Sequence, residues 1–318
     1  MPNTGYTSCG FQSNLQAHRS LARAVTVDSE VATNFRTLHT LTVGLNCKRM
    51  NRPEKLYHFT KTETALRWIL PKEMISKNSR LKLNKISNMN DPKENLLFVT
   101  DLDECIQNPI ELYSMSGESY VIANYIREES KILCFSTDRE INGKKKEGYQ
   151  LQRMWSQYGM NCSGVCIELD FEKFIKSNEK LIDAAQIKHG YVQYNHYNFF
   201  NIPSPLHGVS AETAKTYKPK TLKEFWRDLQ TNEKFIKERF FSKNSDWEGE
   251  SEYRFLTFEN EEDYQFMNIT DSVERIILGL NFSKHYLPSI EKLVPKEKIF
   301  LLKMNHDEEF CIRPIKNN

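Results

Sequence analysis

The segment Lys243–Phe258 (KNSDWEGESEYRFLTF) constrains the fold most, because a cluster of acidic residues runs directly into a strand-forming stretch. Side chains of a strand alternate between two faces, so a strand over Ser251–Phe258 would place Glu252, Arg254 and Leu256 together. Apolar residues occupy both faces, which is typical of an interior strand. A buried carboxylate is costly unless a cation pairs with it or a functional site uses it. The segment therefore predicts either a structural Glu252–Arg254 pair or a carboxylate that serves a site.

The composition limits the partners and the compartment that we expect. A formal net charge of +2, from 44 basic and 42 acidic residues, gives no general reason to expect an anionic partner. No apolar run is long enough to cross a bilayer, and the N-terminus lacks the apolar core of a secretory signal. The seven cysteines form no CxxC pair, which is typical of reduced thiols. We therefore expect a cytoplasmic protein without a membrane partner.

The distribution of residues along the chain indicates one structured domain, preceded by a leader of different composition. Residues 1–49 are rich in Thr, Ser, Asn and Ala with weak periodicity, so we expect a peripheral or flexible leader. Residues 50–318 alternate strand and helix patterns without an internal repeat. This segment is long enough to bury the core of a single domain. Their C-terminal part, Val273–Ile315, predicts β-α-β and a last strand. The pattern predicts one α+β domain with a mixed or split β-sheet and flanking helices.

The run Leu56–Thr60 (LYHFT) predicts a short strand that leads into a helix. Thr60 and Glu63 have the spacing of a capping box, and apolar residues at helical spacing follow. His58 would then lie near the free N–H groups of a helix N-terminus, where anionic oxygens bind. A histidine that is hydrogen-bonded to the backbone is the structural alternative.

Other stretches predict the rest of the domain. Lys131–Thr137 and Ser163–Asp170 are expected strands, and Asp170 is expected to cap the helix that follows. Arg139–Arg153 is expected to be a polar, lysine-rich loop, and Asn195–Lys220 a long loop. A single amphipathic helix is expected from Thr221 to Phe240.

The common catalytic signatures are absent. The chain has no GxxxxGK[ST], GxGxxG, GxSxG or HExxH motif and no paired-cysteine metal spacing. What remains is a set of polar and aromatic residues near the predicted strand ends: His58, Ser136, Trp155, Tyr158, Trp247 and Glu252.

Five motifs carry a family resemblance. They are LYHFT (56–60), NDPKE (90–94), CFST (134–137), MWSQYG…GVCIELD (154–170) and K…WEGESEYRF (243–255). In this order and spacing they resemble the bacterial family of domain of unknown function 2971 (DUF2971).

A more distant likeness concerns mechanism. An aromatic-flanked His at the end of a strand, a later Tyr and a Glu on a late strand resemble the His–Tyr–Glu arrangement of ADP-ribosyltransferases. This resemblance implies a split sheet that binds NAD as a substrate, with Glu252 as the catalytic residue. The NAD-binding residues that it implies are His58, Thr60, Ser136, Trp155, Tyr158, Trp247 and Arg254, and it implies no metal.

The same resemblance implies a toxin or anti-phage defence protein that modifies nucleic acid or protein, with an antitoxin or defence-system partner. Two alternatives stay open. One is a metal-dependent nuclease that uses Asp91, Glu94 and either Glu168 or Asp170, together with a lysine. The other is a non-catalytic sensor or binding module in which the Glu252–Arg254 pair is structural.

Overall fold

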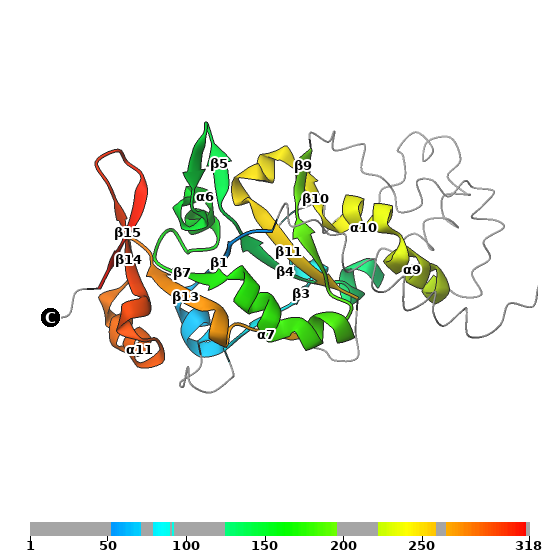
Figure 1. Ribbon diagram of the computed structural model, residues 1–318, viewed down its shortest axis with the longest axis horizontal. Coiled ribbons are helices and arrows are strands. Elements are labelled where there is room, and N and C mark those ends of the chain that lie inside the picture. Colours follow the sequence, from blue (N-terminus) through cyan, green and yellow to red (C-terminus); the bar gives the residue numbers. More distant parts are fainter. Residues whose placement is uncertain are drawn as a thin grey trace, which may run out of the picture. The chain divides into compact units, whose positions relative to one another are not determined.

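The computed structural model describes residues 52–70, 79–89, 91, 125–195, 222–258 and 265–315 (Figure 1). The chain divides into two compact units, Met1–Arg52 and Pro53–Asn318. The described residues belong almost entirely to the second unit. The predicted leader over 1–49, Glu94 and most of the predicted loop 195–220 lie outside the described residues, so they stay predictions.

A nine-stranded mixed sheet forms the centre of the second unit, in the order β15-β14-β13-β7-β1-β4-β11-β8 with β3 beside β4 (Figure 1). Its strands are β1 (Lys55–Thr60), β3 (Asn84–Lys85), β4 (Lys131–Ser136), β7 (Val165–Asp170), β8 (Lys188–Tyr191), β11 (Glu252–Thr257), β13 (Val273–Leu278), β14 (Ile299–Met304) and β15 (Phe310–Pro314). Among the described pairs of this sheet, β13 and β14 alone run parallel. They are joined through a helix, as a parallel connection requires, so the predicted β-α-β unit is confirmed.

The helices and the smaller strand pairs surround this sheet. The helices are α2 (Thr62–Thr64), α6 (Gln152–Gln157), α7 (Phe171–Ala184), α9 (Leu222–Thr231), α10 (Glu233–Phe240) and α11 (Leu287–Leu293), with a π-helical turn over Ala65–Ile69 and a 3-10 turn over Ser245–Glu250. The smaller pairs join β2 (Arg80–Lys82) to β12 (Phe266–Asn268), β5 (Arg139–Ile141) to β6 (Lys144–Lys146), and β9 (Gln193–Asn195) to β10 (Ser242–Asn244). The mixed sheet with several helices agrees with the predicted α+β class.

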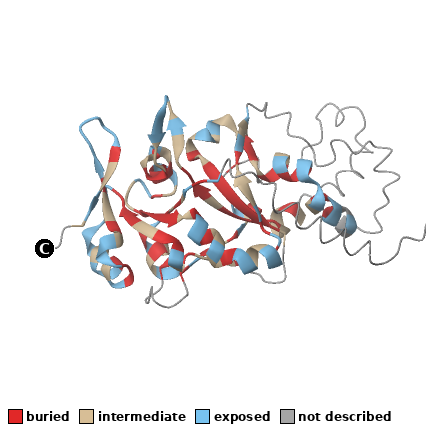
Figure 2. Ribbon diagram, in the orientation of Figure 1, coloured by how far each residue is buried: buried red, intermediate tan, exposed pale blue. Residues whose placement is uncertain are grey.

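The central strands of the sheet are largely buried (Figure 2), and different apolar clusters cover its two faces. On one face, Phe174 of α7 packs against Phe135 and Phe255, and Phe171 packs against Tyr253, in the largest apolar cluster of the described residues. The other face carries two separate clusters. One gathers around Trp155 of α6, and the second gathers residues of α9 and α10 with β4 and β11. A space between these two clusters is where a site can form.

Three local predictions are wrong, each for a local reason. Lys61 rather than Thr60 precedes α2, and no side chain caps that helix, so the predicted capping box does not form. The predicted loop 139–153 contains the β5–β6 hairpin, because Asn142 and Gly143 adopt the positive φ of a tight hairpin turn. The predicted single helix 221–240 is two helices, because the Asn232 side chain accepts from Phe235 N and caps α10. The predicted cap of α7 by Asp170 is confirmed.

Candidate functional site

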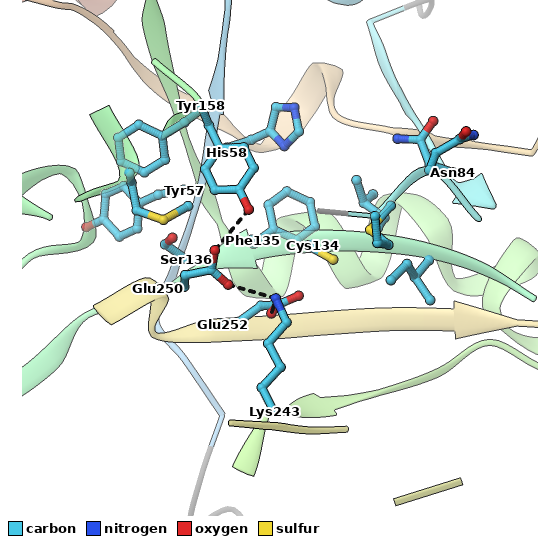
Figure 3. A pocket seen from close by; sticks show the side chains of 16 residues that line it. Tyr57, His58, Asn84, Cys134, Phe135, Ser136, Tyr158, Lys243, Glu250 and Glu252 are labelled. Carbon is cyan, nitrogen blue, oxygen red and sulfur yellow. Dashed lines mark hydrogen bonds and ion pairs between the residues drawn. The ribbon is translucent and has the colours of Figure 1, made fainter. Parts of the chain in front are cut away.

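A cavity of about 240 Å³ opens where β1 and β4 separate (Figure 3). β1 pairs with β7 at six positions but with β4 only at Tyr57 and Ser136. Beyond that pair the two strands part, so side chains from both strands reach the space between them. The lining residues are Tyr57, His58, Phe59, Asn84, Asn88, Met89, Ile132, Leu133, Cys134, Phe135, Ser136, Met154, Tyr158, Lys243, Glu250 and Glu252.

The cavity lies between the two apolar clusters of the face opposite α7 and extends through the split to Leu133 and Phe135, which belong to the cluster on the α7 face. Phe59 and Met154 belong to the cluster around α6, whereas Ile132 and Met89 belong to the cluster around α9 and α10. The position of the cavity therefore follows from the split between β1 and β4, with apolar residues of all three clusters around it.

One end of the cavity is a buried network of four charged side chains. Arg254 holds Glu252 through two hydrogen bonds, Nε to Oε1 at 2.5 Å and Nη2 to Oε2 at 3.0 Å. Lys243 Nζ lies 2.9 Å from Glu252 Oε2 and 2.8 Å from Glu250 Oε2. The exposed fractions of these four side chains do not exceed 6%. The two carboxylates and two cations balance, which is the condition for burying such charges.

The network fixes the ionisation of Glu252. Burial alone would raise the pKa of this carboxyl, but the guanidinium of Arg254 and the ammonium of Lys243 outweigh it and lower the pKa below its ordinary value. The same burial raises the pKa of the Cys134 thiol, which is hydrogen-bonded to Glu252. The site therefore presents an ionised carboxylate beside a protonated thiol.

Ser251 brings the two carboxylates together. It connects the 3-10 turn that ends at Glu250 to β11, with a left-handed φ of 48°. Its carbonyl accepts hydrogen bonds from Thr137 N at 2.9 Å and Thr137 Oγ1 at 3.0 Å. A non-glycine residue in this conformation costs of order 1 kcal/mol, and such strain is concentrated at functional sites. The turn directs Glu250 and Glu252 toward the same lysine.

His58 lines the cavity beside Phe135, with ring centroids 6.0 Å apart. Removal of the ring from water lowers the pKa of His58 to about 4, and a backbone hydrogen bond with Cys134 opposes this shift. The imidazole is therefore neutral at pH 7. A neutral ring has one donor and one acceptor, and the hydrogen bond with Cys134 uses one of them, so the other can serve a ligand.

Ser136 carries a buried hydroxyl that lacks a hydrogen-bond partner among the described residues. It is 1% exposed and lines the cavity directly opposite Glu252 in the β4–β11 register. Buried hydroxyls in native proteins nearly always have a partner, so each exception calls for an explanation. A polar ligand in the cavity would supply that partner.

Four of the eight predicted site residues line this one cavity: Glu252, His58, Ser136 and Tyr158. Tyr158 donates its hydroxyl to Glu250 Oε1 at 2.9 Å, as Figure 3 shows. Residues separated by almost 200 positions in the sequence are thus adjacent, because β1, β4 and β11 are neighbours in the sheet.

The other four predicted residues lie outside the lining. Trp155 is fully buried, packs edge-on against Phe59 and donates to Tyr149 O at 2.7 Å, so it is a core residue. Trp247 lies beside Arg153 and Lys243, at 4.8 and 5.2 Å from their cationic groups. The remaining two are Thr60, buried at the end of β1, and Arg254, which contacts Glu252 from behind.

Sequence reasoning missed Lys243, Glu250 and Cys134 as site residues. Glu250 and Lys243 are both part of the acidic segment, but nothing in a single sequence tells which of four neighbouring carboxylates turns inward. The signal that was available is alternation in β4, because Cys134 and Ser136 share one face of that strand. Cys134 is two residues before Ser136 on β4, so a prediction that places Ser136 in a site also indicates Cys134.

The residues of the metal-site alternative have structural roles where they are described. Asp170 caps α7, and Glu168 is 1% exposed and paired with Lys55 and Arg275. Asp91 is buried, and Glu94 is not described. Within the described ranges no group of three or more His, Cys, Asp or Glu side chains could hold a metal ion.

The fold and the cavity define an α+β protein whose mixed sheet opens a ligand-sized space beside a buried charge network. Residues 154–255 match the sequence model of the family described as "Protein of unknown function (DUF2971)". This span includes Tyr158, Lys243, Glu250 and Glu252, and it confirms the DUF2971 resemblance over about a third of the chain. No curated protein and no solved structure matches the chain. In the described part of the chain, helices fall short of the length and apolarity that crossing a membrane requires.

Proposed function

We propose that the cavity binds NAD as a substrate and promotes cleavage of its nicotinamide–ribose bond, as in an ADP-ribosyltransferase-like effector. The observation that carries the proposal is the meeting of His58, Ser136, Tyr158 and Glu252 at one cavity. The resemblance to ADP-ribosyltransferases implies a shared site for these residues. A split between neighbouring strands is also the kind of cleft that it implies.

The size of the cavity supports binding of part of the dinucleotide. Pockets that enclose drug-sized ligands have volumes of about 300–1,000 Å³. A cavity of about 240 Å³ therefore suits the nicotinamide–ribose half, with the adenylate half outside it. Asn84 and Asn88, both exposed, lie where the ligand would leave the cavity. Figure 3 shows Asn84 well separated from Glu250.

The chemistry suits the residue types at the charged end. The bond between the ribose anomeric carbon and the nicotinamide nitrogen breaks, and its electron pair goes to the nitrogen, so neutral nicotinamide leaves. The ribose acquires the positive charge of an oxocarbenium ion. Water or an acceptor hydroxyl then forms a new C–O bond to this carbon and releases its proton to solvent. A fixed carboxylate near the developing charge lowers the barrier by about 3 kcal/mol, by analogy with other preorganised groups.

The aromatic walls support binding of the oxidised nicotinamide ring, which is cationic. Phe135 and Tyr158 present aromatic groups to the cavity, and aromatic faces attract cations. Because His58 is neutral, it adds no positive charge that would repel this ring. Ser136 offers a hydrogen-bond partner for a sugar hydroxyl or the carboxamide.

Nicotinamide release tests the proposal. Purified full-length protein is incubated with NAD, and free nicotinamide is quantified by chromatography. We expect release by the wild-type protein, a loss of about tenfold in His58→Gln because a hydrogen-bonding group of the cavity is lost, and no change in His285→Gln, whose histidine is exposed. Absence of release at any protein concentration, or full activity in folded His58→Gln, would contradict the proposal.

Transfer to a macromolecule is a separate part of the proposal. The family likeness implies a nucleic-acid or protein acceptor in a toxin or defence setting. Incubation with adenylate-labelled NAD and either total nucleic acid or total protein should label one of them. Nicotinamide release without label on either would limit the activity to hydrolysis by water.

A non-catalytic binding module is the second candidate. The bidentate Arg254–Glu252 pair favours it, because that geometry is also typical of a structural ion pair. Under this alternative the protein binds NAD, as measured by calorimetry, and releases no nicotinamide.

A further inference from the structure

We infer that Glu250, rather than Glu252, is the carboxylate that contacts the ribose of the substrate, and that Glu252 is a positioning residue. The identity of the substrate in this inference rests on the proposed function. The assignment of the two carboxylates rests on their hydrogen bonds alone.

Glu252 has little capacity left for a ligand. A carboxylate offers about four acceptor positions, two on each oxygen. Arg254 occupies two of them and Lys243 a third, and the thiol of Cys134 is a further donor. A ribose hydroxyl could bind Glu252 only by displacing one of these donors. Arg254 and Lys243 are cations, and Arg254 and Cys134 are fixed on strands β11 and β4.

Glu250 keeps capacity and faces the cavity. Among the described residues it accepts from two donors, Tyr158 Oη on Oε1 at 2.9 Å and Lys243 Nζ on Oε2 at 2.8 Å. About two acceptor positions therefore remain. Ribose presents two neighbouring hydroxyl donors, a number that matches them. The unpartnered hydroxyl of Ser136 gives the sugar a further contact at the same end of the cavity.

The charge network explains why two carboxylates are needed. Arg254 is 1% exposed and, besides Glu252, donates to Phe240 O at 2.7 Å. Loss of the Glu252 charge would leave this guanidinium without its buried carboxylate. Loss of the Glu250 charge leaves Lys243 still paired with Glu252. Glu252 therefore carries the structural role in the network, and Glu250 is available to the substrate.

Three glutamate variants test this division, with Glu248→Gln as the matched control because Glu248 is exposed on the same turn. We expect Glu250→Gln to lower kcat/KM for nicotinamide release by about 100-fold or more and to lower the unfolding midpoint clearly less than Glu252→Gln does. Glu252→Gln should lower the unfolding midpoint by roughly 10 °C. Glu248→Gln should change neither quantity.

A double variant separates positioning from contact if Glu252→Gln folds poorly. Glu252→Gln combined with Arg254→Met removes both charges of the pair, so it should recover most of the midpoint and keep kcat/KM within about tenfold of the wild type. A folded but inactive double variant, together with an active Glu250→Gln, would reverse the assignment and overturn the inference.

The failure of the proposed function is distinguishable from the failure of this inference. If the wild type releases no nicotinamide, the proposed function fails, and the unfolding midpoints still decide between the carboxylates. A loss of midpoint in Glu250→Gln as large as that in Glu252→Gln would show that both are structural, which overturns the inference. A midpoint loss that is clearly larger in Glu252→Gln than in Glu250→Gln supports it.

Discussion

Arg254 and Glu252 are two residues apart on β11, and their side chains point to the same face and form a bidentate ion pair with contacts of 2.5 and 3.0 Å. This pair lies at the end of a cavity, where Lys243 joins Glu252 to Glu250. The structural pair that the sequence suggested is thus part of a network that borders the cavity. If the cavity binds the proposed substrate, we expect stability and ligand binding to be coupled through this network.

Removal of the guanidinium should be costly. In Arg254→Met, Glu252 keeps Lys243 but loses two hydrogen bonds in a buried position, and Phe240 O loses a donor. We expect the free energy of unfolding to fall by about 3–5 kcal/mol, measured by chemical denaturation. Arg227→Met, at an exposed position on α9, is the control and should change it by less than about 0.5 kcal/mol. A loss below about 1 kcal/mol in Arg254→Met would contradict this account of the network.

Two buried serines should respond oppositely to loss of the hydroxyl. Ser136 Oγ lacks a partner among the described residues, whereas Ser272 Oγ donates to Ile269 O at 2.9 Å. Ser136→Ala should therefore be neutral or stabilising, and Ser272→Ala should cost about 1 kcal/mol. Thermal unfolding of both variants without ligand measures the difference. A clear destabilisation of ligand-free Ser136→Ala would show that its hydroxyl already has a partner.

Two tyrosine hydroxyls that donate to glutamates form a second matched pair. Tyr158 donates to buried Glu250 at 2.9 Å, and Tyr286 donates to exposed Glu63 at 3.0 Å. We expect Tyr158→Phe to lower the free energy of unfolding by about 1–2 kcal/mol, because a bond to a buried charged group is lost. Tyr286→Phe should cost less, since water replaces the exposed partner. Equal losses in urea denaturation would contradict the burial of the Tyr158 contact.

The stability of the protein should depend on the protonation of His58. The folded-state pKa of His58 is about 4, below its ordinary value of 6.5. The unfolded chain therefore binds the proton more readily, so this histidine's contribution is present above pH 6.5 and is lost as pH falls toward 4. We expect the free energy of unfolding to decline over this range in the wild type and to decline less in His58→Gln. His285→Gln should follow the wild type, and an identical decline in all three proteins would refute the shift.

The depressed pKa of Glu252 predicts a second acid window. Its folded-state pKa lies below the ordinary value of 4.5, so its stabilising charge is present above pH 4.5 and is lost at lower pH. Acid unfolding of the wild type should steepen below pH 4.5. The Glu252→Gln, Arg254→Met double variant should lack this steepening below pH 4.5. If the double variant still shows it, carboxylates other than Glu252 cause the acid transition.

The central strands were predictable from the sequence, because their signal is local. Strands β1, β4, β7 and β11 are interior and have apolar residues on both faces, which is the pattern that their sequences show. The helix break at Asn232 also has a local signal, a capping residue, but the helical periodicity on both sides of it predicts one continuous helix. The hairpin at Asn142–Gly143 has a turn dipeptide, but the run of lysines beside it is typical of a solvated loop.

The site was predictable only in part, because it depends on which strands are neighbours. His58 and Glu252 meet because β4 lies between their strands and pairs with β1 at one position. No pattern within a single strand reports such a split. The resemblance to ADP-ribosyltransferases implies Trp155 and Trp247 as NAD-binding residues, yet packing of α6 buries the first and the 3-10 turn places the second outside the cavity lining. The inward turn of Glu250 depends on the left-handed Ser251, which no local signal announces.

The most direct test of the central claim is a crystal structure of the protein soaked with NAD. We predict density for the nicotinamide–ribose half, or for ADP-ribose after cleavage, between His58 and Glu250, with a ribose hydroxyl within hydrogen-bond distance of a Glu250 oxygen. An empty cavity at saturating NAD, or NAD bound elsewhere on the protein, would contradict the account.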